Sequence, residues 1–374
     1  MARPSLLIIS FSEIVSDARV LKQVRLFTPD YDVTTCSYGA APDGVVDHVA
    51  IPAGLVYWAY PKPEVVARRF GAAYRKNPVV AYLWDRLPRD HFDVILADDV
   101  DTVPLARHIG ARKGIHADLH EYAPRMKEEL TRWRLFVAPL MRWICREHVA
   151  RVESVTTVAE GIAREYEKEF GFRPTVVTNA SPYADLGPTP VGDPIRLVHA
   201  GAARADRYLE LMIDAVDLVR LPVTLDFFLT TNDPAYLDRL REHASRVPGV
   251  RVHPALPYAR LIGELNTHDV GIYILPPVNF NNEWALPNKL FDFVQARLGL
   301  VFGPSPEMAA IIRRYGIGLV TEEFTATSLA ASIEQLTPDL VARFKQASDD
   351  CALALSAQSQ VKEWARSIAR LAAE

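Results

Sequence analysis

A ten-residue stretch near position 290 combines residue types that suit a phosphorylated ligand. It runs Ala285-Leu286-Pro287-Asn288-Lys289-Leu290-Phe291-Asp292-Phe293-Val294. Pro287 precedes an apolar run with helical spacing, which predicts a helix start, and the unpaired N–H groups of a helix start attract an anion. Lys289 adds a positive charge for phosphate, and Asn288 and Asp292 project from one helical face. A carboxylate one turn inside such a helix suits the paired hydroxyls of a ribose, although an ordinary amphipathic helix with a surface lysine shows the same pattern.

Acidic residues and a histidine follow two apolar runs in the first half of the chain. Asp98-Asp99-Val100-Asp101-Thr102 comes after the run at 92–97, and Asp118, His120 and Glu121 end the run at 115–119. Both runs predict strands, and parallel sheets bind ligands at the carboxyl ends of their strands. We therefore expect these side chains to converge. Three carboxylates in one loop are also a pattern that Mg²⁺ uses.

Alternating strands and helices must position these groups. Apolar runs predict strands at 6–11, 32–37, 92–97, 115–119, 154–158, 176–178, 195–199, 223–228, 250–252, 270–274 and 300–303. Helical patterns fall between most of them, which indicates parallel α/β units and a doubly wound sheet in each half. The Pro- and Gly-rich stretch 181–194 separates the halves. The predicted organisation is a Rossmann-like domain at 1–185, a linker at 186–194, a second Rossmann-like domain at 195–355, and a C-terminal helix at 356–374 that crosses back to the first domain.

Composition narrows the class of protein. The chain has 374 residues, enough for about two domains, with 49% hydrophobic and 24% charged residues, as in a soluble globular protein. Its net charge of −4 argues against a nucleic-acid partner. No apolar run approaches the ~20 residues of a membrane span, and the run at 6–9 is too short for a signal peptide. Three widely spaced cysteines make neither a disulfide framework nor a zinc site, which fits a reducing cytoplasm.

Several separated motifs in a fixed order carry a family resemblance. They are Asp17-Ala18-Arg19-Val20, Asp98-Asp99-Val100-Asp101-Thr102, Asp118-Leu119-His120-Glu121-Tyr122, Thr156-Thr157-Val158-Ala159-Glu160, Asn179-Ala180, His199-Ala200-Gly201 and Leu286-Pro287-Asn288-Lys289-Leu290-Phe291-Asp292. With them, nearly the whole chain resembles the GT-B-fold glycosyltransferases, specifically the large retaining family four in its Pro-Asn-Lys-Leu-Phe-Asp branch. The resemblance implies two Rossmann-like domains that face each other across a cleft. It also implies that the first binds the acceptor and the second a nucleoside-diphosphate sugar, without a metal ion or cofactor.

The resemblance also implies roles on the donor side. Asp292 is similar to the family's ribose-binding acid, with Asn288 and Lys289 at the diphosphate. Family members place two cations shortly after the first glycine of the second domain, which here is Gly201, so Arg204 and Arg207 are the candidates. Both could bind a diphosphate bidentately as it leaves.

One position departs from the family pattern. A glutamate near the donor sugar is usual eight residues before the ribose-binding acid, and that position holds Trp284 in this chain. Glu283 is adjacent and could substitute if the loop shifts, while Trp284 could stack on a sugar ring. The donor-sugar contacts stay open between these two.

On the first domain, His120 resembles the active-site histidine of the family. An imidazole or its carbonyl there could stabilise an oxocarbenium-like centre or hold a sugar hydroxyl, and a structural histidine that caps a strand is the alternative. Glu121 could orient His120 or face the acceptor. The acceptor-side candidates are Asp17, Arg19, Asp99 and Asp101; Asp17 and Arg19 could instead form an ion pair that shapes the first loop, and Asp101 could cap a helix.

Two basic segments lie in the first half. Residues 62–89 contain seven Lys or Arg against two acids, and residues 123–151 contain seven against three. Apolar residues at helical spacing from Leu130 to Ile144 are flanked by arginines, a pattern that fits either peripheral contact with an anionic membrane or a core-facing helix with solvated arginines. The membrane alternative would place the protein at the inner face of a membrane. A basic first domain would also suit a lipid-linked anionic acceptor.

The predicted function is therefore a retaining, metal-independent glycosyltransferase that uses a UDP-linked sugar in glycan, glycolipid or natural-product biosynthesis. The acceptor is a carbohydrate, a lipid-linked molecule or a small molecule. Two alternatives remain: a sugar-nucleotide epimerase on the same scaffold, and a non-catalytic partner subunit that binds nucleotide sugars, which Trp284 favours. A nicotinamide dehydrogenase is disfavoured because no Gly-x-Gly-x-x-Gly follows any predicted strand.

Overall fold

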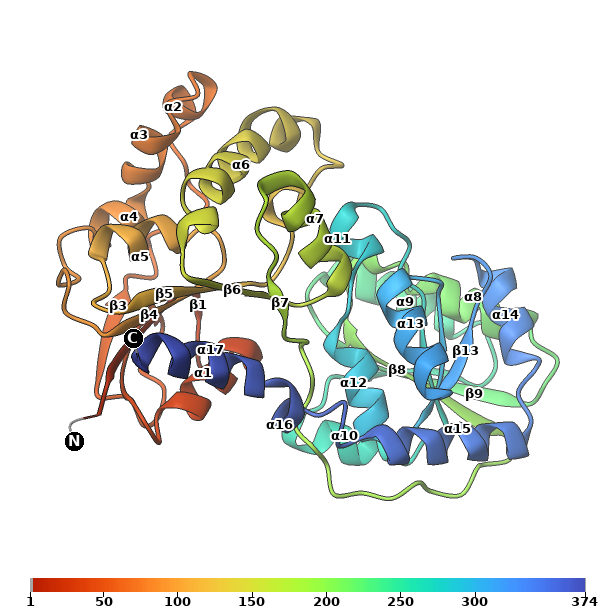
Figure 1. The fold of residues 1–374 in the computed structure, drawn as a ribbon. Coiled ribbons are helices and arrows are strands. Elements are labelled where there is room, and N and C mark those ends of the chain that lie inside the picture. Colours follow the sequence, from red (N-terminus) through yellow and green to blue (C-terminus); the bar gives the residue numbers. More distant parts are fainter. Residues whose placement is uncertain (1–2, 374) are drawn as a thin grey trace. The chain divides into compact units, whose positions relative to one another are not determined.

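The computed structural model describes residues 3–373, which fold into two compact units (Figure 1). Unit 1 contains the residues up to Thr178, Asn279–Asn281 and the residues from Val361 on; unit 2 contains Asn179–Val278 and Asn282–Gln360. Each unit is built on one parallel sheet, as the alternating pattern predicts.

The sheet of unit 1 has seven strands in the order β3-β2-β1-β4-β5-β6-β7. Their bounds are β1 Ser5–Glu13, β2 Asp32–Tyr38, β3 Asp47–Ile51, β4 Val94–Asp98, β5 Gly114–Leu119, β6 Ser154–Thr157 and β7 Thr175–Val176. The order reverses direction between β1 and β4, which is the switch point where such sheets bind ligands. Leu6 to Ile9 are fully buried because helices cover both faces of the sheet.

Strand β3 was not predicted. It lies at the sheet edge beside β2 and begins Asp47-His48, with its first four residues exposed or half-buried. An edge strand needs no long apolar run, and the run of β3 is limited to its last three residues, Val49-Ala50-Ile51.

The helices of unit 1 include α1 Ala18–Phe27, α2 Lys62–Val66, α3 Phe70–Arg75, α4 Pro78–Leu83, α5 Val103–Ile109, α6 Ala138–Glu147, α7 Glu160–Phe170 and α17 Lys362–Ala373. Helices α1 and α17 lie side by side on one face of the sheet, with α4, α5 and α6 on the other (Figure 1). The C-terminal helix thus returns to the first sheet, as expected, where Trp364, Ile368 and Leu371 pack into its core.

The sheet of unit 2 has six strands in the order β10-β9-β8-β11-β12-β13. Their bounds are β8 Ile195–Ala202, β9 Val223–Thr230, β10 Val250–Pro254, β11 Val270–Tyr273, β12 Gly299–Phe302 and β13 Gly318–Val320. The helices are α8 Glu210–Leu218, α9 Pro234–Ala244, α10 Tyr258–Asn266, α12 Asn288–Gln295, α13 Pro306–Tyr315, α14 Ala326–Ile333, α15 Pro338–Cys351 and α16 Ala357–Gln360. The short helix α11 Phe280–Glu283 is divided, with Phe280 and Asn281 in unit 1 and Asn282 and Glu283 in unit 2. The switch point of this sheet lies between β8 and β11.

Residues 177–194 form neither helix nor strand, in keeping with their Pro and Gly content. The division between the units falls after Thr178, earlier than the predicted domain limit at residue 185. The reason is that the first part of this stretch packs on unit 2: the Ser181 hydroxyl donates to Asp292 at 2.5 Å, and the Ala184 N–H donates to Gln295 at 3.0 Å.

The apolar and basic segment around α6 divides into two parts. Leu140, Met141 and Ile144 are buried, as a core-facing helix requires, whereas Leu135 and Phe136 in the preceding turn are 58% and 40% exposed. Peripheral membrane contact through this turn stays a prediction. No helix within residues 3–373 has the length and apolar character needed to cross a bilayer.

Candidate functional site

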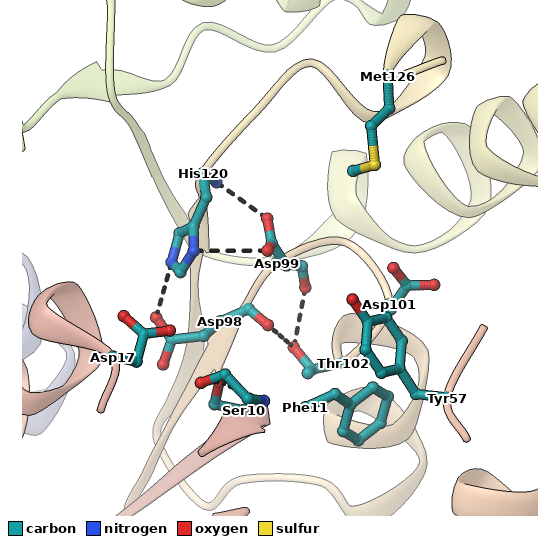
Figure 2. A pocket seen from close by; sticks show the side chains of 11 residues that line it. Ser10, Phe11, Asp17, Tyr57, Asp98, Asp99, Asp101, Thr102, His120 and Met126 are labelled. Carbon is teal, nitrogen blue, oxygen red and sulfur yellow. Dashed lines mark hydrogen bonds and ion pairs between the residues drawn. The ribbon is translucent and has the colours of Figure 1, made fainter. Parts of the chain in front are cut away.

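The polar centre of unit 1 is His120, at the carboxyl end of β5. Its backbone N–H donates to Asp99 Oδ1 at 3.0 Å, and its Nδ1 lies 3.4 Å from Asp99 Oδ2. On the other side of the ring, Nε2 lies 3.3 Å from Asp98 Oδ1 and 3.6 Å from Asp118 Oδ2. Figure 2 shows the imidazole between Asp98 and Asp99. Strands β4 and β5 are neighbours in parallel register, which is why residues 20 positions apart in the chain converge.

Carboxylates surround this imidazole and set its charge. Burial alone would lower the pKa of His120, but Asp99, Asp118 and Asp98 outweigh burial and hold that pKa well above its ordinary value. Burial raises the pKa of Asp98 to about 7, against the opposing effect of His120. The ring is therefore an imidazolium at neutral pH, within a set of groups whose net charge is negative.

Asp99 is the most open carboxylate of this group. Its side chain is 41% exposed, and its φ of 66° lies in the left-handed region that a non-glycine residue rarely adopts. The Thr102 hydroxyl, 2.9 Å from the carbonyl oxygens of Asp98 and Asp99, holds the turn. Such strain is kept only where the surrounding structure fixes it, and it is concentrated at functional sites.

Arg19 forms a bidentate ion pair with Asp118. Its guanidinium donates to both carboxylate oxygens, at 2.8 and 2.7 Å, and to the Val177 carbonyl at 2.9 Å. Burial would raise the pKa of Asp118, yet Arg19 keeps it well below its ordinary value. The expected ion pair between Asp17 and Arg19 is therefore wrong: Asp17 instead caps α1 by accepting from the backbone N–H groups of Arg19 and Val20.

Three of these side chains could in principle hold a metal ion. The ligand atoms of Asp98, Asp118 and His120 lie within 4.8 Å of one another. The donor set does not suit a cation, however, because the Arg19 guanidinium already occupies both oxygens of Asp118 and the imidazole is held in its charged form. Metal independence stays a prediction.

A small polar pocket of about 70 Å³ opens beside this group (Figure 2). Of the residues predicted for the first domain, its lining includes His120, Asp17, Asp99 and Asp101, together with Asp98. Glu121 is exposed and Arg19 is 3% exposed, and neither lines it.

The predicted donor residues gather at the carboxyl edge of the second sheet. Helix α12 begins at Asn288, directly after Pro287, and a pocket of about 340 Å³ is lined by Gly201, Asn288, Lys289 and Asp292 among others. The buried face of α12, which includes Leu290, Phe291 and Phe293, fixes the helix against the core.

Asp292 is 8% exposed and already accepts two hydroxyls. The Ser181 Oγ and Tyr258 Oη donate to its Oδ1 at 2.5 and 3.0 Å. Both donors belong to unit 2, and Tyr258 lines the same pocket. The carboxylate therefore lies where it can accept a pair of hydroxyl groups.

Lys289 presents a half-buried positive charge at the same pocket. Within residues 3–373 its ammonium has no hydrogen-bond or ion-pair partner, and it lies 5.1 Å from the Tyr273 ring centre. Burial, and then the charge of Arg207, lowers its pKa to about 8. A β-carbon at Gly201 would collide with this ammonium, so the strand end must be glycine for the lysine to lie there.

His199, on β8, is a second incompletely bonded group in this region. Its Nδ1 lies 3.0 Å from the Ile272 carbonyl and its buried Nε2 has no partner among the described residues. Burial, helped by Lys289, lowers the pKa of His199 to about 3, so the ring is neutral.

The remaining predicted donor residues are less central. Arg204 pairs with Asp206 at 2.8 Å and is 53% exposed; Arg207 is the cation whose charge acts on Lys289. Neither arginine lines the pocket, nor do Glu283, which is exposed, and Trp284.

Sequence reasoning missed part of both sites. It did not select Asp98, although the motif containing it was recognised, nor Tyr258, Phe228 and Thr230 in the second pocket. Thr230 ends β9 and Tyr258 begins the helix after β10, so attention to every strand's carboxyl end would have found both.

Comparison with known proteins identifies relatives by structure only. No protein-family model matches the chain, and no curated protein does. Among solved structures, Anabaena HepE in complex with UDP aligns with a TM-score of 0.72 at 11% identity, over 98% of this chain and 100% of HepE. The alpha,alpha-trehalose 6-phosphate synthase of Burkholderia multivorans aligns with a TM-score of 0.71 at 10% identity, over 100% and 98%. These likenesses establish that the two-sheet architecture is the GT-B fold.

Proposed function

We propose that the protein is a glycosyltransferase that moves a sugar from a nucleoside-diphosphate sugar, UDP-linked, to an acceptor hydroxyl. The observation that carries the proposal is the half-buried ammonium of Lys289, which has no hydrogen-bond or ion-pair partner within residues 3–373 and lies beside the start of α12 and Asp292. A partly desolvated cation with only the more distant charge of Asp292 to offset it is costly, and an anionic ligand would reduce that cost. Solved proteins of the same fold were captured with UDP and UDP-glucose, which supports the choice of ligand.

The donor would bind with its parts matched to these groups. Its diphosphate would lie at Lys289 and the first N–H groups of α12, with Arg207 nearby. Its ribose hydroxyls would donate to Asp292 in place of Tyr258 and Ser181. Gly201 would allow the backbone to approach the phosphates closely.

The carboxylate group of unit 1 would serve the reacting sugar and the acceptor. In the transfer, the bond from the anomeric carbon to the diphosphate oxygen breaks, and a bond to the acceptor oxygen forms. The hydroxyl proton passes to the departing diphosphate. Positive charge develops at the anomeric carbon as this bond breaks, and negatively charged groups near it would stabilise the transition state. Retention of configuration is part of the proposal through the resemblance to the retaining family.

The first test is nucleotide binding. We expect UDP to raise the melting temperature of the wild-type protein, because a ligand of the native state stabilises it. Asp292→Ala should weaken UDP binding by roughly tenfold or more in isothermal titration calorimetry, since it removes a charge-assisted hydrogen bond. Asp238→Ala, at a 75% exposed position of α9, is the matched control and should bind as the wild type does. Equal UDP affinity in all three proteins would refute the donor-site assignment.

The second test is turnover of UDP-sugars without an acceptor. Slow release of free sugar and UDP is expected of a transferase that uses water as a poor acceptor. Interconversion of intact sugar nucleotides would identify an epimerase instead, and binding without any turnover would identify a partner subunit.

A further inference from the structure

Unit 1 contains a second cavity, of about 470 Å³, next to the polar pocket. Its walls are aromatic rings and thioethers: Tyr57, Trp58, Tyr60, Trp133, Met126 and Met141. We call it the aromatic cavity. It shares Tyr57, Met126 and Asp101 with the polar pocket, so the two spaces meet at these residues.

We propose that the aromatic cavity binds the apolar body of the acceptor, an uncharged aromatic or alicyclic alcohol, and that Asp101 accepts the hydrogen bond of the acceptor's hydroxyl. This inference rests on the proposed function, because it names the substrate class of the acceptor side of that same site.

The size and lining of the cavity favour such a ligand over a carbohydrate. Small-molecule sites of roughly 300–1,000 Å³ are mostly apolar with a few placed polar groups. Beyond the aromatic rings and thioethers, the lining consists of Asp101, Lys127, Val137 and the hydroxyls of Tyr57 and Tyr60, of which the Tyr60 hydroxyl already donates to Asp101. A sugar carries a hydroxyl on most of its carbons and would leave several without partners in this cavity, at a cost for each.

Asp101 is fixed at the junction of the two spaces. The Tyr60 hydroxyl donates to its Oδ1, and the Tyr74 hydroxyl donates to its backbone carbonyl at 2.6 Å. Its Oδ2 accepts no hydrogen bond within residues 3–373, which leaves that oxygen for a ligand. Burial, together with Asp99, raises the pKa of Asp101 to about 6, so it is ionised at neutral pH and acts only as an acceptor.

The charge of the residues that line the two spaces favours an uncharged alcohol over an anionic one as the acceptor. The polar pocket that the hydroxyl would face is lined by four carboxyl groups, those of Asp17, Asp98, Asp99 and Asp101, against the single cation of His120. These repel a phosphate at the reacting end of the acceptor. The basic residue of the aromatic cavity, Lys127, is exposed and therefore lies in high dielectric, where its attraction for an anion is weak.

The backbone at one wall supports a binding role. Trp133–Val137 form a single turn of π-helix before α6, and both end residues of this turn line the cavity. Such turns are rare overall, and many of those that occur lie at functional sites. Trp58, on another wall, is 69% exposed. Its ring meets the Tyr57 ring edge to face, with 4.9 Å between the ring centres. A ligand in the cavity would therefore cover a ring that now faces water.

The test measures binding of 2-naphthalenemethanol to the full chain by isothermal titration calorimetry. Val137→Trp fills the cavity and should weaken binding by roughly tenfold or more. Leu135→Trp adds the same side chain to the same helical turn, at a position that is 58% exposed and outside the lining, and should bind as the wild type does. Equal binding by both variants and the wild type would overturn the cavity assignment.

A second measurement tests Asp101. The wild type should prefer the alcohol to its methyl ether by roughly tenfold, because a carboxylate can only accept and the ether has no proton to give. Asp101→Asn should lose this preference, since its NH₂ group can donate to either oxygen. If Asp101→Asn preferred the alcohol to the ether as strongly as the wild type does, the role of Asp101 would be overturned. Binding of either compound by Asp101→Asn would show that this variant is folded.

Other occupants are further outcomes. Maltose or dodecyl phosphate could bind more tightly than 2-naphthalenemethanol and lose that binding in Val137→Trp. This result would overturn the proposal in favour of a sugar or an anionic lipid, respectively. UDP binding is measured in parallel on every variant. Normal UDP binding without alcohol binding refutes this inference alone, whereas alcohol binding without UDP binding refutes the proposed function.

Discussion

The two units share a strand order yet place different charged groups at the same position. In both, the central strand, β1 or β8, is followed by a reversal of the order, and the functional candidates lie at the carboxyl ends beside it. In unit 1 these are Asp98, Asp99 and His120, two carboxyl groups on either side of an imidazole. In unit 2 they are Gly201, Lys289 and Asp292, with a half-buried lysine that has no hydrogen-bond or ion-pair partner within residues 3–373. The sheet provides the position, and a few loop residues decide which ligand it can take.

The two regions also differ in how far their polar groups are satisfied. Asp118 accepts from Arg19, Gln23 and Thr156 at 2.7–2.8 Å, so the base of the first site is rigid without any ligand. Lys289 and the Nε2 of His199 have no such partners among residues 3–373. The first region is preorganised by internal bonds, and the second stores a desolvation cost that a bound anion would relieve.

The largest effect is expected from a substitution that breaks the internal hydrogen bonds of the first region. Arg19→Met leaves the fully buried Asp118 without its counter-ion, so the free energy of unfolding should fall by about 3–5 kcal/mol. Denaturant titration followed by circular dichroism measures this. Arg25→Met, on the exposed face of the same helix, should change stability by less than about 0.5 kcal/mol. If Arg19→Met were as stable as this control, the ion pair would not organise the site.

An intermediate effect is expected at the cation of the second region. Gly201→Ala places a methyl group where the Lys289 ammonium lies, so the lysine must move away. The Gly201 φ of 158° is one that a residue with a side chain rarely adopts, so some stability should also be lost, and UDP affinity measured on the folded variant should fall roughly tenfold to a hundredfold. Gly263→Ala, where no atom lies within 4 Å of the added carbon, is the control. A large loss of stability with unchanged UDP affinity would contradict the assignment.

The smallest effect concerns pH. The pKa of Lys289 is lowered to about 8, so the ammonium is present below pH 8 and is lost as pH rises through that value. The terminal phosphate of UDP is already ionised there. UDP affinity should therefore fall by up to about tenfold between pH 7.5 and 9.5. Lys289→Arg keeps its charge and should bind with a flat profile; a flat profile in the wild type would show that Lys289 does not contact the diphosphate.

Local sequence patterns predicted most of the fold. Strands covered on both faces are continuous apolar runs, and every predicted run became a strand within a few residues of its expected ends. The edge strands Asp47–Ile51 and Gly318–Val320 were not predicted, since their apolar runs, Val49-Ala50-Ile51 and Leu319-Val320, are short. For the sites, the sequence predicted which loops would contribute more reliably than which side chains would line a pocket. Asp292 and Lys289 share a pocket, whereas Glu283 and Trp284 do not line it.

What the sequence determined by itself is the alternation of elements and the residue types at strand ends. These depend on neighbours in the chain, through apolar periodicity and helix starts. Only the tertiary structure decided the contacts: that Arg19 pairs with Asp118 rather than Asp17, that Lys289 lies against Gly201, and that aromatic and methionine side chains between residues 57 and 141 line one cavity. Such contacts join positions tens of residues apart, and their formation depends on strand order and packing, which no local pattern encodes.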